Sequence, residues 1–371
     1  MTCARHDRDP LVSNPREVIS AGGGHPTHKQ VVQELPGVLD VVAVVSNPFL
    51  YQSRYDLYRA FARHMEASNV RLTTVELAFG ARVWEVTEPN NPRHVQLRTN
   101  SELWHKENLI NLGIARLPRD WEYAAWIDAD VTFQRPDWAQ ATLQALQHYE
   151  VVQPWSTAQD LDAKHDVMAT FRSFCRCYRD YVDNAPAKAE QIPREVVYAG
   201  SGYPVPVGPT PLPYVYHGYW HPGFAWAIRR DAWEQIGGLI DFAILGAADF
   251  YMAWGLIGQL DTHLYHIEID RDSMGGYTSS YLKSLMVWQE KAKCLLRNIG
   301  YVPGTLLHHW HGPKSKRGYN SRESILISEK YDPEQDLIRD WQGVFRLKKN
   351  RISLRDKIRA YFQARDEDAT S

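Results

Sequence analysis

Apolar runs rich in branched residues alternate with amphipathic stretches over the first part of the chain. Residues 39–46 and 71–78 are typical of strands buried on both faces. Between them the apolar residues of 52–67 recur at helical spacing, and a short predicted strand at 94–98 precedes an amphipathic helix at 104–117. Strands and helices joined by short links predict an α/β fold with a mainly parallel central sheet flanked by helices.

Two carboxylates, Asp128 and Asp130, interrupt the apolar run 123–133. A buried strand tolerates carboxylates near its end, where they are paired or bound to a metal, and two acids one residue apart can hold a divalent cation. An Asp-x-Asp triplet by itself is also common in proteins without such a role. The run predicts a strand that ends in a metal site, a hypothesis that depends on the other residues at the same rim.

In a parallel α/β sheet, ligands bind beyond the carboxyl ends of the strands. Pro48 and Arg54 follow the first predicted strand, and Glu76 lies near the end of the second. We therefore expect all three residues at the rim that carries Asp130.

Residues 155–220 have the least regular pattern. A helix is predicted near 167–182, whereas the prolines that follow exclude a helix and predict a long loop. The aromatic residues of this loop either form an acceptor-binding wall or pack the loop against the domain. The candidates are Tyr216, Tyr219 and Trp220.

The next segment predicts a strand at 224–228, a short helix at 231–236 and a further helix at 250–257, which Asp249 precedes. An acid at a helix N-terminus is held ionised by the helix dipole. This position suits a general base, and it equally suits a plain N-cap.

Three histidines stand close together, His308, His309 and His311. Neutral imidazoles are common metal ligands, although a single histidine is more often a core residue. In an ideal strand His309 and His311 share a face, so a pair made of His308 and His311 requires a bend in the chain.

Charge and cysteine content narrow the class of protein. The net charge of −2 over 371 residues gives no overall field for nucleic acid or membrane, and four cysteines are too few and too scattered for a disulfide framework. The N-terminus carries charges where a signal peptide has an apolar core, and no long apolar run is present in the sequence. We expect a soluble, cytoplasmic protein of bacterial or viral (phage) type.

In their order along the chain, these motifs resemble those of GT-A fold glycosyltransferases, in particular the inverting β-1,4-galactosyltransferase and chondroitin-synthase group. The turn at Pro48 with Arg54 is similar to that group's Pro-Phe-Arg nucleotide-binding turn, with the arginine displaced. Residues 105–113 are similar to its Asn-Arg-x-x-Leu-Leu-Asn-Val-Gly helix, with Lys106 in place of the arginine.

The resemblance assigns roles to the acidic residues. It implies that Asp130 binds the metal and that Asp128 lies near the nucleotide ribose. Residues 223–249 are similar to the family segment that ends in Gly-Gly-Glu-Asp, whose final aspartate is the catalytic base and corresponds to Asp249. Ala248 replaces the glutamate that contacts the acceptor in the family, so the usual acceptor is in doubt.

The resemblance also implies the remaining metal ligands. His308 and His311 are three residues apart, like the two family positions that complete the metal shell, the first of which is a methionine in galactosyltransferases. The implied cofactor is Mn²⁺ or Mg²⁺. The implied donor is a nucleoside diphosphate sugar, and the resemblance favours a UDP-sugar.

The implied activity is metal-dependent, inverting transfer of a hexosyl or pentosyl group to a hydroxyl acceptor. The favoured acceptor is a saccharide. Three alternatives remain open at this point. They are transfer to hydroxylated bases of DNA, a nucleotidyltransferase, and a catalytically silent carbohydrate- or nucleic-acid-binding module.

Two basic segments bear on the acceptor. Arg317 and Arg322, in the run 314–322, are candidate acceptor contacts. Residues 346–359 combine basic residues with an apolar stripe, which predicts a helix that packs on its own domain or contacts an anionic membrane or nucleic acid.

The expected layout has three parts and a subdivided centre. It consists of a mobile lead-in at 1–37, a single GT-A type domain at 38–345 and a basic amphipathic C-terminal helix at 346–371. Within the domain we expect a nucleotide-binding part at 38–154 and an insertion at 155–220. The third part, at 221–330, would contribute the acceptor site, the base and the remaining metal ligands.

Overall fold

The computed structural model of the protein describes residues 37–184, 220–260, 276–318 and 322–370. The predicted lead-in up to residue 36 and the proline-rich loop up to residue 219, with Tyr216 and Tyr219, lie outside the described residues. Residues 37–371 form one compact unit.

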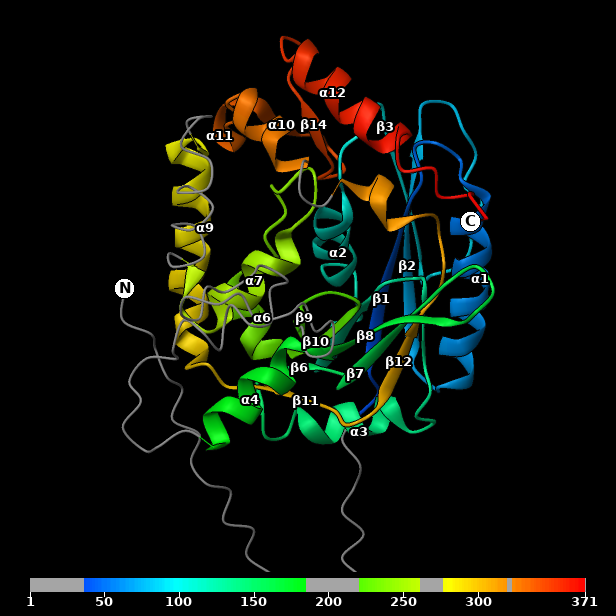
Figure 1. Cartoon of the computed structure of the whole chain (residues 1–371), viewed down its shortest axis with the longest axis vertical. Coiled ribbons are helices and arrows are strands. Elements are labelled where there is room, and N and C mark those ends of the chain that lie inside the picture. The colour runs from blue at the N-terminus through cyan, green and yellow to red at the C-terminus, as the bar shows by residue number, and fades with distance from the viewer. Residues whose placement is uncertain (1–36, 185–219, 261–275, 319–321, 371) are drawn as a thin grey trace, which may run out of the picture. The chain divides into compact units, whose positions relative to one another are not determined.

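A seven-stranded sheet forms the centre of the described structure, in the order β11-β6-β10-β4-β1-β2-β3 (Figure 1). Its strands are β1 (Asp40–Ser46), β2 (Arg71–Phe79), β3 (His94–Thr99), β4 (Tyr123–Ile127), β6 (Val151–Gln153), β10 (Ala225–Arg229) and β11 (Ile299–Tyr301). β10 runs antiparallel to β4 and β6, while the other neighbours are parallel. The predicted α/β fold with a mainly parallel central sheet is therefore confirmed.

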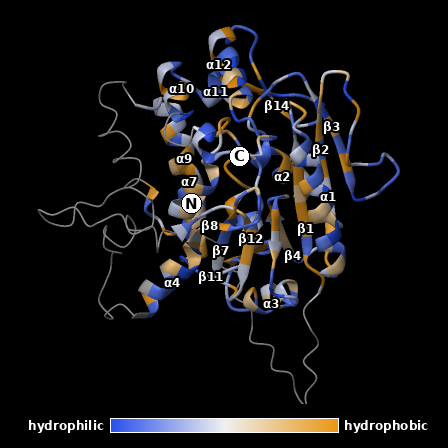
Figure 2. Ribbon diagram, turned by 45° about the vertical axis from the view of Figure 1, so that its right-hand side comes forward, coloured by the Kyte–Doolittle hydropathy of each residue, from blue (hydrophilic) through white to orange (hydrophobic). Residues whose placement is uncertain are grey.

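The central strands are apolar because helices cover both of their faces. Alternate residues of β1 enter different cores: Val42 packs into one, and Val41 and Ala43 into the other. Figure 1 shows α1 (Gln52–Ala67) and α2 (Lys106–Ile114) on opposite sides of β1 and β2. Figure 2 shows the hydrophobic residues concentrated along these strands, as a sheet buried on both faces requires.

Further helices extend the two cores. α3 (Trp138–Ala145) packs on the same side as α1. The other side is covered by α6 (Arg230–Ile236), α7 (Ala248–Leu256), α9 (Ser279–Ala292), α10 (Arg322–Ser328) and α12 (Ile352–Gln363). Shorter elements join them: α11 (Pro333–Asp336), η2 (Lys293–Leu295), η3 (Lys314–Arg317) and the hairpin of β13 (Leu337–Arg339) and β14 (Phe345–Leu347).

A second, five-stranded sheet lies beyond the end of β4 and has the order β5-β12-β7-β8-β9. Its strands are β5 (Val131–Phe133), β7 (Thr157–Leu161), β8 (Val167–Ser173), β9 (Trp220–His221) and β12 (Thr305–His308). β5 pairs antiparallel with β12, and β12 pairs parallel with β7. This sheet connects the end of the 123–133 run to the histidine segment.

The prediction of a helix near 167–182 is wrong in its first part. β8 occupies Val167–Ser173, and the helix α4 begins only at Phe174 and ends at Asn184. Exposure alternates along β8, where Ala169 and Phe171 are less exposed than their neighbours, and the strand pairs antiparallel with β7. Two-residue alternation together with this pairing favours the strand.

The C-terminal helix packs on its own domain. Leu354, Ile358, Tyr361 and Phe362 of α12 are buried in the same core as α7 and α9. The chain then returns to α1, beside which Figure 1 shows the C-terminus. None of the described helices combines the length and the apolar character that a membrane span requires.

Candidate active site

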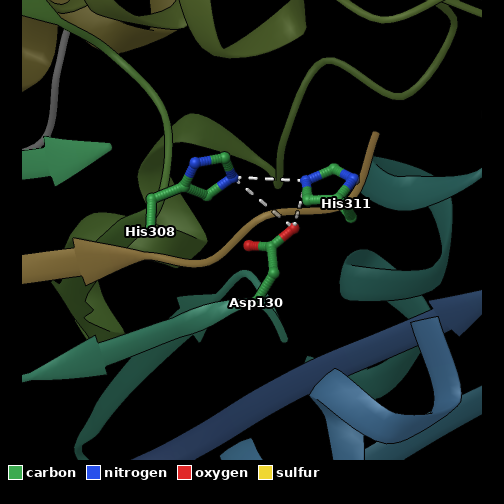
Figure 3. Close-up of side chains that lie close together, drawn as sticks. All are labelled: Asp130, His308 and His311. Atoms are coloured by element: carbon green, nitrogen blue, oxygen red, sulfur yellow. Dashed lines mark hydrogen bonds and ion pairs between the residues drawn. The ribbon is translucent and has the colours of Figure 1, made fainter. Parts of the chain in front are cut away.

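The carboxylate of Asp130 and the imidazoles of His308 and His311 converge at the junction of the two sheets (Figure 3). We call these three residues the cluster. Oδ2 of Asp130 lies 3.0 Å from Nε2 of His311 and 3.8 Å from Nε2 of His308. The two Nε2 atoms are 3.2 Å apart. A ligand atom from each residue lies within 4.8 Å of the others, which is the spacing that a single metal ion requires.

Strand pairing explains this convergence. β4 ends at Ile127, Asp130 immediately precedes β5, and β5 pairs with β12 so that Val131 lies opposite His308. β12 ends at His308, after which the chain turns and His311 faces the same point. The bend that a His308 and His311 pair requires is therefore present.

His309 points elsewhere. Its backbone N–H donates to the carbonyl of Asp130 at 2.9 Å, while its Nε2 lies 2.8 Å from Oγ1 of Thr132. Geometry thus separates His309 from the two histidines of the cluster.

A buried carboxylate stands behind each imidazole. Oδ1 of Asp160 lies 2.6 Å from Nδ1 of His308, and Oε2 of Glu367 lies 3.7 Å from Nδ1 of His311. Both acids are almost fully buried, at 2% and 1% exposure of their side chains. A carboxylate behind the ring favours a proton on Nδ1, which leaves the Nε2 lone pair free to bind a metal.

The acid of the cluster is held ionised. Burial by itself would raise the pKa of Asp130, but His308 and His311 outweigh it and hold that pKa well below its usual range. Oδ1 of Asp130 is buried and has no hydrogen-bond partner within the described structure. An ionised carboxylate with an unpaired buried oxygen fits a cation at this point.

Asp128 has a different partner. Its carboxylate forms an ion pair with the ammonium of Lys106, in the first turn of α2. Burial disfavours the charged lysine, but Asp128, Glu107 and Asp249 outweigh burial and raise the pKa of Lys106. A fixed ammonium therefore stands next to the cluster.

Asp249 reaches the pocket from the first turn of α7. Gly246 and Ala247, with φ of 93° and 72°, turn the chain into this helix. Oδ1 of Asp249 accepts a hydrogen bond from the backbone N–H of Phe250 at 2.9 Å. A Cβ atom on Gly223 would lie 2.9 Å from Oδ2 of Asp249, so this glycine leaves room for the carboxylate.

A single pocket brings most of the predicted site residues together. Pro48, Arg54, Lys106, Asp128, Asp130, Asp249, His308, His311, Arg317 and Arg322 all line it. Arg317 also donates to the carbonyls of His311 and Gly312, at 3.3 and 3.5 Å. The pocket thus contains the cluster, the candidate base and several cations.

Glu76 and Trp220 are placed differently from what was predicted. The carboxylate of Glu76 is buried and accepts hydrogen bonds from the loop after β2, namely from the N–H groups of Glu85 and Val86 and the hydroxyl of Thr87. It shapes this loop and is not part of the pocket lining. Trp220 is buried against Phe174, Phe250 and Trp254, so it packs the core instead of forming an acceptor wall.

The pocket also has lining residues that no sequence motif singled out. Five of them that carry titratable groups are Glu107, His221, Lys314, Arg365 and Glu367. Burial raises the pKa of Glu107 to about 8, although Lys106 opposes this, and burial together with nearby Lys314 lowers the pKa of His221 to about 3. Glu107 adjoins Lys106 in the first helical turn, so that position could have suggested it. No sequence motif surrounds Glu367.

No protein-family model and no curated protein sequence matches the chain. Among solved structures, the chain is similar to a mutant Drosophila β1,4-galactosyltransferase 7 in complex with manganese, UDP-Gal and xylobiose, with 13% identity over 58% of this chain and 60% of that chain and a TM-score of 0.28. The catalytic domain of the same enzyme with xylobiose matches at 12% identity over 84% and 95%, with a TM-score of 0.32.

A third similar structure is glucosyl-3-phosphoglycerate synthase from Mycobacterium tuberculosis, in complex with Mn²⁺, UDP-glucose and phosphoglyceric acid. It matches at 13% identity over 84% of this chain and 86% of that chain, with a TM-score of 0.34. Similarities this distant assign no activity to the chain.

Proposed function

We propose that the protein is a metal-dependent glycosyltransferase that transfers a sugar from a nucleoside diphosphate sugar to a hydroxyl acceptor, with inversion at the anomeric carbon. The donor that we propose is a UDP-sugar. The observation that carries this proposal is the presence of the Asp130 cluster and the carboxylate of Asp249 in one pocket that is rich in basic side chains. The basic residues of the pocket are Arg54, Lys106, Lys314, Arg317, Arg322 and Arg365.

Asp130, His308 and His311 would hold the metal. Two imidazoles and one carboxylate suit Mn²⁺ better than Mg²⁺, which prefers oxygen ligands and retains water. When bound, a divalent cation supplies positive charge that stabilises a diphosphate leaving group. Lys106 and Arg54 add cationic side chains at the same pocket and would bind the donor's phosphates.

Asp249 would act as the general base. Its carboxylate accepts the proton of an acceptor hydroxyl while that oxygen bonds to the anomeric carbon. The bond between this carbon and the diphosphate oxygen breaks on the opposite face, so the configuration inverts. Gly223 leaves the Oδ2 side of the carboxylate uncrowded, which supports this role.

A saccharide hydroxyl is the acceptor that we favour over nucleic acid or membrane. In the C-terminal segment, Lys357 pairs with Glu329 and Arg359 with Glu102, and Arg351 lies 3.1 Å from Asp336. Cations that are already paired with acids attract an external polyanion less strongly. Acceptor transfer that is insensitive to added salt would support this choice, and a steep loss of affinity with salt would contradict it.

Asp249→Asn tests the central assignment. The amide keeps the shape of the side chain but does not take the proton, so the rate of sugar transfer is expected to fall by about 10²- to 10⁴-fold. Mn²⁺-dependent UDP binding, followed by calorimetry, is expected to persist. Asp356→Asn, an exposed acid on α12, is the control and is expected to match the wild type.

Product analysis in the same assay separates the alternatives. A glycosyltransferase releases a nucleoside diphosphate, whereas a nucleotidyltransferase releases pyrophosphate. Full transfer activity in Asp249→Asn would refute its role as the base, and pyrophosphate release would refute glycosyl transfer.

A further inference from the structure

The chain after α12 is anchored between α1 and the turn that carries His311. The carboxylate of Asp368 accepts hydrogen bonds from the backbone N–H groups of Gln52 and Ser53, at 2.9 and 2.8 Å, at the start of α1. On the other side, Nε1 of Trp310 donates to the carbonyl of Ala369 at 2.7 Å. Both anchors fix residues 364–369, which we call the C-terminal strap, against the pocket.

Backbone contact between the strap and the histidine turn is direct. A Cβ atom on Gly312 would lie 2.5 Å from the carbonyl oxygen of Asp366 and 2.8 Å from Cα of Glu367. Gly312 also has φ of 85°, a conformation that favours glycine. The residue that follows His311 is therefore shaped to accept the strap.

The strap places the carboxylate of Glu367 at the metal cluster and at Arg54. Its Oε1 accepts hydrogen bonds from Nη2 of Arg54 at 2.8 Å and from Nε of Arg365 at 2.6 Å. Its Oε2 pairs with Nε of Arg54 and faces Nδ1 of His311 at 3.7 Å. Nδ1 of His311 is buried and has no hydrogen-bond partner within the described structure, so Oε2 is the acceptor that it faces.

The two histidines of the cluster are therefore supported in parallel ways. Asp160 already holds Nδ1 of His308 by a short hydrogen bond, and Glu367 stands in the equivalent position behind His311. The first carboxylate comes from β7 in the sheet, but the second comes from the end of the chain.

We propose that Glu367 is a positioning residue for the metal centre, which holds Nε2 of His311 toward Asp130 and fixes Arg54 at the edge of the pocket. This inference rests on the proposed function, since it takes the same cluster to bind a metal. In this role Glu367 acts through His311 and Arg54, and not on the substrate itself. The C-terminal strap is consequently part of the site, although it lies far from the other site residues in sequence.

The test is the affinity of the full chain for Mn²⁺, measured by electron paramagnetic resonance titration without any nucleotide or sugar. Glu367→Gln is expected to weaken Mn²⁺ binding by about 10- to 100-fold, the effect typical of losing a partner that orients a metal-binding histidine. Asp366→Asn is the matched control, because this neighbouring strap carboxylate pairs with exposed Lys316 and asparagine tolerates its positive φ of 48°.

Glu367→Asp provides a second variant that keeps the negative charge beside Arg54 and Arg365, should the glutamine variant fail to fold. It withdraws the carboxylate from His311, so it is expected to bind Mn²⁺ more weakly than the wild type while melting cooperatively. The absorption spectrum of the Co²⁺-loaded protein should also change in both Glu367 variants, because the geometry of the His311 ligand changes, and should not change in Asp366→Asn.

Wild-type Mn²⁺ affinity in folded Glu367→Gln or Glu367→Asp would overturn the inference and leave the proposed function standing. Tight Mn²⁺ binding by the wild type without any sugar transfer would refute the proposed function and leave the role of Glu367 intact. Absence of Mn²⁺ binding by the wild type would overturn both.

Discussion

Nε2 of His311 lies 3.0 Å from Oδ2 of Asp130, and this contact depends on the pairing of two short strands. β5 directly follows Asp130, and β12 ends three residues before His311. Their antiparallel register brings the two ends together. This candidate metal site thus depends on the second sheet as much as on the Asp-x-Asp triplet.

This geometry predicts different roles for the three histidines. Replacing His308 or His311 by alanine removes an imidazole that faces Asp130. Loss of a residue that only orients a metal ligand typically weakens metal binding by about 10- to 100-fold, and we expect each of these two variants to lose more Mn²⁺ affinity than that. His309→Ala removes a ring that bonds Thr132, so Mn²⁺ affinity is expected to stay close to that of the wild type. Calorimetric titration of the three variants checks the prediction, and a large loss in His309→Ala would contradict it.

The sequence predicted those elements whose pattern is local. The strand at 39–46, the helix at 52–67 and the strand at 71–78 match β1, α1 and β2 within one residue, because long apolar runs and helical spacing specify them. β7 was missed and β8 was predicted as helix, because both are stabilised by pairing with β12 or with each other.

The residues of the candidate site also divide into those that a local motif predicts and those that depend on tertiary contacts. Asp128, Asp130, Asp249, His308 and His311 stand in recognisable motifs, and the structure brings them to one pocket. Glu76 also lies on a strand that leads to the rim, but its carboxylate accepts hydrogen bonds from three donors of the following loop. No local sequence pattern predicts these hydrogen bonds. Glu367 reaches the pocket only through tertiary contacts of the C-terminal strap, which no local pattern encodes.

Gly223 provides a test of how tightly Asp249 is placed. A Cβ atom there would lie 2.9 Å from Oδ2 of Asp249 and 2.8 Å from Cε1 of His221, so both side chains must shift in Gly223→Ala. Since misplacement of a reacting group by about 1 Å can slow a reaction about 10²-fold, kcat for sugar transfer is expected to fall by a similar factor.

The donor's KM should change little in Gly223→Ala, because the metal cluster is not displaced. Gly304→Ala is the control: its Cβ meets only the side chain of Arg135 at 3.4 Å, an ordinary contact. Steady-state kinetics of both variants checks the prediction. Unchanged kcat in Gly223→Ala would mean that the carboxylate of Asp249 is not constrained in its active position.

The buried carboxyl group of Glu107 is expected to make the stability of the protein depend on pH. It lines the pocket, is buried, and accepts a hydrogen bond from Nε1 of Trp104 at 3.0 Å. Burial raises its pKa from 4.5 to about 8, so between these pH values the folded protein holds a proton that the unfolded chain has lost. A folded state that binds more protons becomes less stable as pH rises, by about 1.4 kcal/mol per pH unit for one group.

Glu107→Gln cannot titrate at this position, and it isolates the effect. The free energy of unfolding, from urea denaturation between pH 5 and 8.5, is expected to fall with pH more steeply in the wild type than in the variant. The difference between the two should level off above about pH 8, where Glu107 is ionised in both states. Parallel stability curves over the whole range would show instead that Glu107 is already ionised in the folded protein, with Lys106 as its counter-charge.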